Sequence, residues 1–464
     1  MYSSPIGRLA CVCLFVLAFL LSLPAGSARA DIGAYIIIDA KSGAVLDQKN
    51  ATRKWYPASL TKMMTAYVTF KAIREGRLTL NSAVVQSKNS ISEPPSKMGF
   101  KVGTRFTVDT ALKIILIKSA NDVAVALGEA VAGSEKAFID TMNAEARRLG
   151  MTQTHFTNPH GLPDNRQVTS ARDMAILAMA LRRDFPESGN FYNHPGIRFG
   201  KKTLRSANRE FLLRVPGANG MKTGYICNSG YNVAASVTRR GRTLIAVILG
   251  AGSGLERTAF AREIFDKGFK KRGGGTKVTS LTGSSGNPPA DGYCRRNKSP
   301  GAKGYMARYD MENKSGGLLA FAGVGKNKKK EIDASGFTKA NGKPDWAKIL
   351  DRTLGPRRVV YRPLQVGLGK PTGTPSKSAS ASASTASIPA EDIPTPTANP
   401  MRRAKSEIRE KLTKTAQGST AGAIPQTASQ RPGAATDTSQ AAPGSIFRKG
   451  LDFTVPVPSP SPRK

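Results

Sequence analysis

Strand-like segments stand at both ends of residues 31–270, and helical patterns fill the interval between them. Residues 34–48 read as two strands around a Ser-Gly turn, and residues 231–251 read as two more around Arg240-Gly241. Apolar spacing typical of helices is found at 58–76, 107–132, 134–149, 170–184 and 254–271. The order predicts an α/β fold in which one antiparallel sheet has flanking helices and an inserted helical region.

The composition changes on both sides of this region. At the N-terminus, Arg8 precedes a short apolar run that ends in Ala28-Arg29-Ala30, the pattern of a signal peptide cleaved after Ala30. An uncleaved anchor is the weaker alternative because the apolar run is short for a membrane span. Near the C-terminus, Ser, Ala, Thr and Pro dominate, and such a segment buries too little apolar surface to fold. The predicted segments are a signal peptide at 1–30, a globular domain at 31–270, a basic linker with a candidate small module at 271–365, and a disordered basic tail at 366–464.

The chain is strongly cationic, with 70 Lys and Arg against 32 Asp and Glu, a net charge of +38. Such a balance indicates an anionic partner. The predicted export argues against nucleic acid and favours the anionic surfaces of the cell envelope. We therefore expect a periplasmic protein, peripheral to the membrane at most, whose basic tail contacts an anionic envelope surface electrostatically.

Four cysteines are present, and Cys11 and Cys13 leave with the signal peptide. Cys227 and Cys294 remain in a compartment that permits disulfides. The sequence leaves two alternatives open, namely a disulfide between them or two free thiols.

Ser59 and Lys62 lie three positions apart at the predicted start of a buried helix, so one helical turn brings their side chains together. A serine hydroxyl needs a base to become a nucleophile, and a lysine can be that base when burial or a second cation lowers its pKa. Backbone N–H groups at a helix start can also hold an oxyanion. The simpler alternative is a capping serine beside a lysine that reaches solvent.

Ser119-Ala120-Asn121 interrupts a stretch of chain that is otherwise almost purely apolar. Buried polar side chains need partners or a function, although a turn between two helices would also explain them. The same Ser-x-Asn spacing occurs at Ser188, Ser206 and Ser285. The buried surroundings favour Ser119.

Lys222-Thr223-Gly224 lies in a strand-like stretch ahead of the second predicted hairpin. The lysine supplies a positive charge, the threonine supplies a hydroxyl donor, and the glycine lets a substrate backbone come close. A basic edge strand with a bulge glycine is the alternative.

The order of the three motifs, Ser59-x-x-Lys62, Ser119-x-Asn121 and Lys222-Thr223-Gly224, resembles that of the penicillin-binding proteins and serine β-lactamases. The surrounding text, including "YPASLTKMMTAYV" and "NGMKTGYICNSGYNVAASV", is similar to the D-alanyl-D-alanine carboxypeptidases of the S11 peptidase type. The resemblance covers about residues 31–270 and implies a serine β-lactamase/penicillin-binding-protein-like fold for this catalytic domain.

The resemblance also implies a role for each motif residue. Ser59 would attack the penultimate D-alanine of a peptidoglycan stem peptide, with Lys62 taking its proton and Ser119 relaying a proton to the leaving D-alanine. Asn121 would hold the substrate amide and the Lys62 amine. The remaining predicted substrate-binding residues are Lys222, Thr223, Gly224 and Tyr225, with the backbone N–H groups of Ser59 and Tyr225 forming the oxyanion hole. β-Lactam antibiotics would acylate the same serine.

No metal or cofactor is expected, because the three histidines show no ligand spacing and His160 matches a structural histidine of the family. One departure from the family pattern is Asn219-Gly220, which stands where an Asp-Gly pair is usual ahead of the lysine.

Other functions on this scaffold remain open at this point. A β-lactamase is disfavoured because the glutamate pattern that class A enzymes use for deacylation is missing from the sequence. A peptidoglycan DD-endopeptidase or transpeptidase differs only in the bond cleaved or the acyl acceptor. A non-catalytic envelope-binding protein, with the tail as its functional part, is the alternative outside enzymes.

Overall fold

The computed structural model describes the predicted globular domain and parts of the chain that follow it. The described residues are 32–271, 275–283, 286–296, 302–309, 335–341 and 343–372. The predicted signal peptide at 1–30 lies outside these ranges, as do residues 373–464 of the predicted tail. Both assignments therefore stay predictions.

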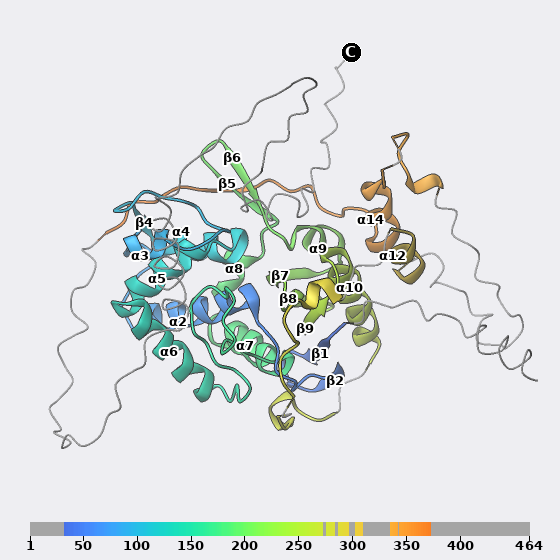
Figure 1. Cartoon of the computed structure of the whole chain (residues 1–464), viewed down its shortest axis with the longest axis horizontal. Coiled ribbons are helices and arrows are strands. Elements are labelled where there is room, and N and C mark those ends of the chain that lie inside the picture. Colours follow the sequence, from blue (N-terminus) through green and yellow to red (C-terminus); the bar gives the residue numbers. More distant parts are fainter. Residues whose placement is uncertain are drawn as a thin grey trace, which may run out of the picture. The chain divides into compact units, whose positions relative to one another are not determined.

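A five-stranded antiparallel sheet forms the centre of the domain (Figure 1). Its strand order is β2-β1-β9-β8-β7, so the two ends of the domain sequence meet where β1 pairs with β9. The strands are β1 (Ala34–Asp39), β2 (Val45–Lys49), β7 (Ala218–Ile226), β8 (Gly230–Arg239) and β9 (Arg242–Ala251). The predicted pairs of strands and the antiparallel sheet that they form are confirmed.

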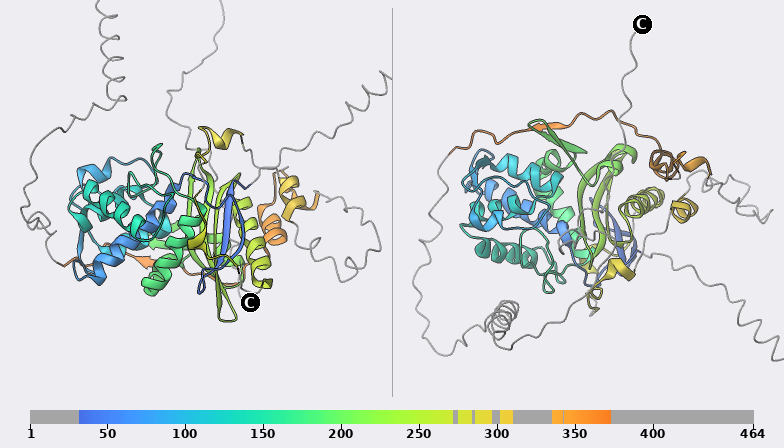
Figure 2. Two further views of the ribbon diagram at one scale, coloured as in Figure 1. Left: turned by 90° about the horizontal axis from the view of Figure 1, so that it is seen from below. Right: turned by 45° about the horizontal axis from the view of Figure 1, so that its top comes forward.

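The sheet separates two apolar cores because successive side chains of a strand point to opposite faces. Along β9, Ile245 and Val247 belong to the core beneath the helical region, whereas Leu244 and Ala246 belong to the core beneath α10 (Gly254–Lys270). Figure 2 shows helices on both sides of the sheet. Burial on both faces explains why this strand reads as a continuous apolar run.

The inserted helical region lies on one face of the sheet and holds the larger core. Its principal helices are η1 (Ala58–Thr61), α2 (Lys62–Arg74), α4 (Val108–Lys113), η2 (Ile114–Lys118), α5 (Asn121–Ala132), α6 (Glu135–Arg148) and α7 (Ala171–Asp184). Shorter helices of this region are α3 (Lys88–Ile91) and α8 (Gly189–Tyr192), whereas α9 (Arg209–Arg214) lies on the other face, where Phe211 contacts Phe265 of α10. The helix predicted at 107–132 is interrupted at Ser119 and Ala120, between η2 and α5. Within the described ranges, no helix combines the length and apolar character that a membrane crossing requires.

Two small sheets that the sequence did not reveal border the helical region. One pairs β3 (Ala83–Val85) with β4 (Arg105–Thr107), and the other has the order β10-β5-β6. The strands of the second sheet are β5 (Gly196–Phe199), β6 (Lys202–Arg205) and β10 (Leu364–Val366). Since β10 pairs in parallel with β5, the chain beyond residue 270 returns to the helical region.

Other described parts of the chain beyond residue 270 also pack on the domain. Helices α12 (Ala302–Tyr309) and α14 (Trp346–Leu354) form a third apolar core with α10, in which Tyr305, Ile349 and Leu350 are buried. The division predicted at residue 270 stays a prediction, but these helices lie against the domain and not apart from it.

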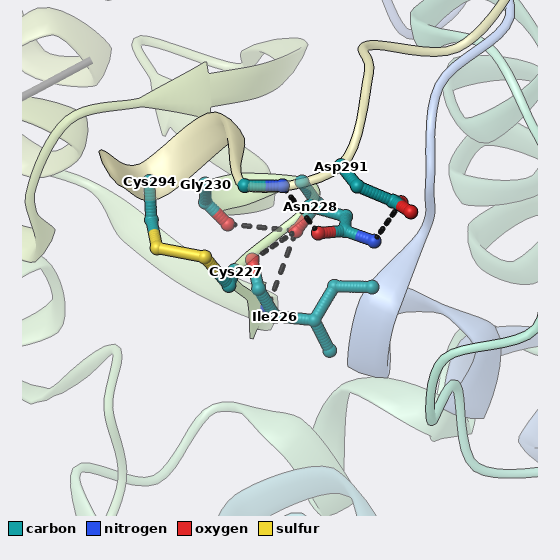
Figure 3. The surroundings of a disulfide bond; sticks show 8 residues. Ile226, Cys227, Asn228, Gly230, Asp291 and Cys294 are labelled. Atoms are coloured by element: carbon teal, nitrogen blue, oxygen red, sulfur yellow. Dashed lines mark hydrogen bonds between the residues drawn. A yellow bond between two sulfur atoms is a disulfide. The ribbon is translucent and has the colours of Figure 1, made fainter. Parts of the chain in front are cut away.

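A disulfide joins Cys227, directly after β7, to Cys294 (Figure 3). The Cys294 N–H also donates to the Cys227 carbonyl at 2.9 Å, and the Asn228 side chain bonds both the Asp291 carboxylate and the Gly292 N–H. The structure thus favours the disulfide over the two free thiols that the sequence left open.

Replacing both cysteines with serine is expected to lower the free energy of unfolding by about 4 kcal/mol, since the bond closes a long loop in the unfolded chain. Denaturant unfolding of the double variant against the oxidised protein measures the effect. The wild type unfolded under reducing conditions is the matched control and should lose a similar amount. An unchanged unfolding midpoint in both samples would contradict the assignment of this disulfide.

Candidate active site

The predicted nucleophile stands at the point where the chain enters the helical region. Ser59 lies in η1, and Lys62 is the first residue of α2, which continues the same helical path. Ala58, directly before the serine, has a φ of +48°, a backbone conformation that is costly for a residue with a side chain. Such strain is common at functional sites, where surrounding contacts hold it in place.

Lys62 connects three parts of the domain through its ammonium group. The side chain is fully buried, and Nζ lies 3.1 Å from Ser59 Oγ, 2.8 Å from Asn121 Oδ1 and 2.7 Å from the His160 carbonyl oxygen. Burial, followed by the positive charge of Lys222, holds the pKa of Lys62 well below its usual value of 10.5, although Glu93 and Asp122 oppose this. The lysine is therefore close enough and acidic enough to exchange a proton with Ser59.

Ser119 owes its position to the break between η2 and α5. It ends η2 with a φ of +68°, in the left-handed region, and Ala120 is extended before α5 begins. Lys222 Nζ donates to Ser119 Oγ at 2.9 Å and to the Thr223 carbonyl at 2.8 Å. The polar residues that interrupt the apolar sequence are thus placed beside the two lysines.

Lys222 is buried without a neighbouring carboxylate in the described part of the chain. Burial, with a contribution from the positive charge of Arg257, lowers the pKa of Lys222 to about 7. Arg257 is itself buried, and its guanidinium donates to the Ala207 carbonyl at 2.8 Å. Lys222 and Arg257 therefore bring positive charge to the site, and in the described residues no carboxylate is hydrogen-bonded to Lys62 or Lys222, which suits a substrate that carries a carboxylate.

The edge strand β7 lies directly against the serine. A Cβ on Gly224 would come within 3.0 Å of the Ser59 nitrogen and 2.9 Å of the Pro57 carbonyl oxygen, so a side chain here would push the strand away. Asn232 on β8 holds the same stretch by donating to the Tyr56 carbonyl at 3.0 Å. This close approach is compatible with the predicted oxyanion hole formed by the N–H groups of Ser59 and Tyr225.

The structure therefore gathers all eight predicted site residues around one centre or along the strand that borders it. They are Ser59, Lys62, Ser119, Asn121, Lys222, Thr223, Gly224 and Tyr225. The structure also argues against the simpler alternative for the first motif, a lysine that reaches solvent, because Lys62 is fully buried. The catalytic and binding roles of these residues remain predictions.

Two contributors were missed by the sequence prediction. His160 acts through its backbone carbonyl on Lys62, and no side-chain pattern reveals such a role. Gly161 follows it with a φ of +92°, and a Cβ there would come within 1.9 Å of the Ala58 carbonyl oxygen. The only available signal was the match of "NPHGLPDN" to a loop of the family.

Glu93, Glu135 and His160 form a group whose side-chain ligand atoms lie within 4.8 Å of one another. The Leu162 N–H donates to His160 Nδ1 at 3.1 Å, so the proton of the neutral ring is on Nε2, which faces Glu93 Oε2 at 3.2 Å. Burial lowers the pKa of His160 and favours this neutral ring. A protonated Nε2 donates a hydrogen bond and does not ligate a metal, so the group is satisfied as it stands.

Comparison with known proteins gives a family match over the same region. The sequence profile of the family described as D-alanyl-D-alanine carboxypeptidase matches residues 24–253. The D-alanyl-D-alanine carboxypeptidase DacA of Haemophilus influenzae is 36% identical over 241 residues, covering 51% of this chain and 61% of that protein. The D-alanyl-D-alanine carboxypeptidase DacB2 of Mycobacterium tuberculosis is 30% identical over 235 residues, covering 49% of this chain and 78% of that protein.

A solved structure supports the predicted fold. Penicillin binding protein 5 from Haemophilus influenzae superposes with a TM-score of 0.50 at 34% identity, covering 52% of this chain and 71% of that one. The serine β-lactamase/penicillin-binding-protein-like fold is thereby confirmed. The matches to these proteins cover about half of the present chain.

Replacing Gly161 with alanine is expected to destabilise the protein by about 3 kcal/mol or more, because the new Cβ would displace the Ala58 carbonyl as well as strain the backbone. Gly150→Ala is the matched control, since Gly150 has a φ of +74° but nothing within 4 Å of its Cβ position. The control should lose about 1 kcal/mol, the cost of the left-handed backbone alone. Thermal unfolding of both variants measures the difference, and equal losses would refute the close packing of Gly161 on η1.

Proposed function

This chain belongs to the D-alanyl-D-alanine carboxypeptidase family, and on that basis we propose that it removes the terminal D-alanine from peptidoglycan stem pentapeptides. The reaction would be that of a serine hydrolase with an acyl-enzyme on Ser59. The observation that carries the proposal is the contact between Ser59 Oγ and the buried, low-pKa Lys62 amine. The family's name supplies the substrate, and the geometry supplies the nucleophile and its base.

The acylation step follows from the positions of the two side chains. Neutral Lys62 takes the Ser59 proton while Oγ attacks the carbonyl carbon of the penultimate D-alanine. Backbone N–H groups at the start of η1 and on β7 stabilise the negative charge on the carbonyl oxygen. The C–N bond then breaks, and Ser119 relays a proton to the amine of the departing D-alanine, giving its own hydroxyl proton and recovering one from the Lys62 ammonium, so that Lys62 is neutral again. Ser119 suits this role because its hydroxyl is hydrogen-bonded to Lys222.

Recognition of the terminal carboxylate is assigned to β7. Lys222 supplies the positive charge, and Thr223 supplies a hydroxyl donor. The carboxylate also compensates the buried positive charge of the free site, so binding favours the protonated form of Lys222. Water then hydrolyses the acyl-enzyme and releases the shortened peptide.

Penicillin binding is part of the same proposal, because a β-lactam presents a reactive amide and a carboxylate to the same groups. The name of the superposed Haemophilus protein states that property for that protein. For this chain, we propose a periplasmic location supported by the N-terminal sequence and a tail that contacts an anionic envelope surface, supported by the net charge of +38.

The decisive test is D-alanine release from a pentapeptide ending in D-Ala-D-Ala, measured for the mature protein and for Ser59→Ala. We expect release by the wild type and a loss of activity in the variant of about 10⁴-fold or more, as the nucleophile is removed. Absence of release by the wild type, together with stable labelling by a fluorescent penicillin, would replace the proposal with an endopeptidase or transpeptidase. Absence of both release and labelling would replace it with a non-catalytic binder.

Lys222→Met should shift the acid limb of the acylation rate to higher pH. The positive charge of Lys222 lowers the pKa of Lys62, so its removal raises that pKa and leaves less neutral base at a given pH. Thr223→Val is the matched control. It should raise KM about tenfold or more through the lost carboxylate contact while leaving the acid limb in place. A limb that moves equally in both variants, or in neither, would contradict the assignment of Lys62 as the base.

A further inference from the structure

We infer that Asp122 is a positioning residue for this reaction, which fastens the loop at residues 93–99 to the start of α5 and thereby holds Asn121 against Lys62. The inference rests on the proposed function of Lys62 as the base. It concerns a side chain outside the three motifs.

Asp122 is fully buried in the first turn of α5, and the donors to its carboxylate in the described part of the chain are backbone N–H groups, while Lys62 and Lys118 act on it only electrostatically. Its acceptors are taken up by backbone N–H groups. Met98 N–H lies 3.0 and 3.1 Å from the two carboxylate oxygens, and Gly99 N–H lies 2.8 Å from Oδ2. These contacts hold the loop to the helix.

The fastened loop in turn determines how Asn121 is presented. The Ser96 carbonyl accepts the Asn121 N–H at 2.7 Å, and the Pro94 carbonyl accepts Asn121 Nδ2 at 2.9 Å. Because Nδ2 is committed to the loop, Oδ1 is left to face Lys62 Nζ at 2.8 Å. Release of the loop would free the amide to rotate and to lose this contact.

A second contact joins the loop to the other side of the same break in the helix. Lys118, the last residue of η2, donates through Nζ to Ser96 Oγ at 3.0 Å. The loop therefore touches both residues that flank the Ser119 turn, Lys118 before it and Asn121 after it. Fastening the loop at Asp122 should therefore help to hold both the Ser119 turn and the Asn121 side chain in place.

The charge of Asp122 provides a second effect that can be measured apart from the first. The charged or titratable groups that act on Lys62 are Lys222, Glu93 and Asp122, with neutral His160 facing Glu93. Lys222 lowers the pKa of Lys62, and the two carboxylates raise it. Removal of the Asp122 charge should thus lower the pKa of Lys62 further and extend activity to lower pH.

Asp122→Asn tests the inference because it keeps the shape of the Asp122 side chain and removes its charge. It also replaces one carboxylate oxygen with an NH₂ group, which cannot accept the backbone N–H that this oxygen binds. We expect amide hydrogen exchange at Met98 and Gly99 to become about tenfold faster or more, as a buried hydrogen bond is lost. We also expect kcat to fall about tenfold while the acid limb of the rate moves to lower pH.

Asp173→Asn is the matched control. Asp173 is likewise fully buried in the first turn of a helix, α7, where its carboxylate accepts the Gln153 N–H at 2.7 Å and the Thr154 hydroxyl at 2.8 Å, and it differs from Asp122 in also pairing with Arg172 at 2.8 Å. That variant should lower the unfolding temperature without changing exchange at Met98 and Gly99 or the acid limb. A purely structural role for Asp122 would leave kcat and the acid limb the same in the two variants, even if exchange at Met98 and Gly99 differed.

Two readouts do not depend on activity. Exchange at Met98 and Gly99, and the titration of Lys62 by NMR of the ¹³C-labelled side chain, are both measured on the mature protein with no substrate peptide bound. Unchanged exchange and an unchanged Lys62 titration in Asp122→Asn would overturn the inference. If the wild type neither releases D-alanine nor is labelled by penicillin, the proposed function fails, while these two measurements still decide whether Asp122 positions the loop.

Discussion

The site depends on a lysine that is buried among neutral acceptors. In the described part of the chain, Lys62 is hydrogen-bonded to a hydroxyl, an amide and a backbone carbonyl, and to no carboxylate. An ammonium group in such surroundings loses its hydration, and the carboxylates of Glu93 and Asp122 offset this loss only in part, so its pKa falls. Because the three acceptors come from η1, α5 and the loop at residue 160, the surroundings of the proposed base form only after distant parts of the chain have come together.

Two further buried basic side chains, Lys222 and Arg257, lie between Lys62 and the far side of the sheet or on it. Arg257 lowers the pKa of Lys222, and Lys222 lowers the pKa of Lys62. Cations gathered in this way destabilise the folded protein when no anion is bound. The arrangement is an example of stability given up at a candidate functional site, since the charges that repel one another would attract the carboxylate of the proposed substrate.

Much of the domain could be predicted because its signals are local. The alternation around Arg240-Gly241 and the helical spacing after Pro57 each lie within a short stretch, and the three motifs name their own side chains. The pairing of β10 with β5 escaped prediction because it joins segments far apart in the chain, and the local β5–β6 hairpin was missed because each of its strands has only four residues. The carbonyl of His160 left no side-chain signal, and the role of Asp122 depends on a loop whose place the sequence does not specify.

The return of β10 to the helical region has a consequence for any shortened form of this protein. Strand β5 is flanked by β6 on one side and by β10 on the other, and Leu368 accepts the N–H of Thr107 at the end of β4. A chain ending at Lys270 would keep every motif residue but would leave the outer edge of β5 with open backbone donors and acceptors. Such an edge is a template for pairing with other copies, so a minimal catalytic fragment would be prone to self-association.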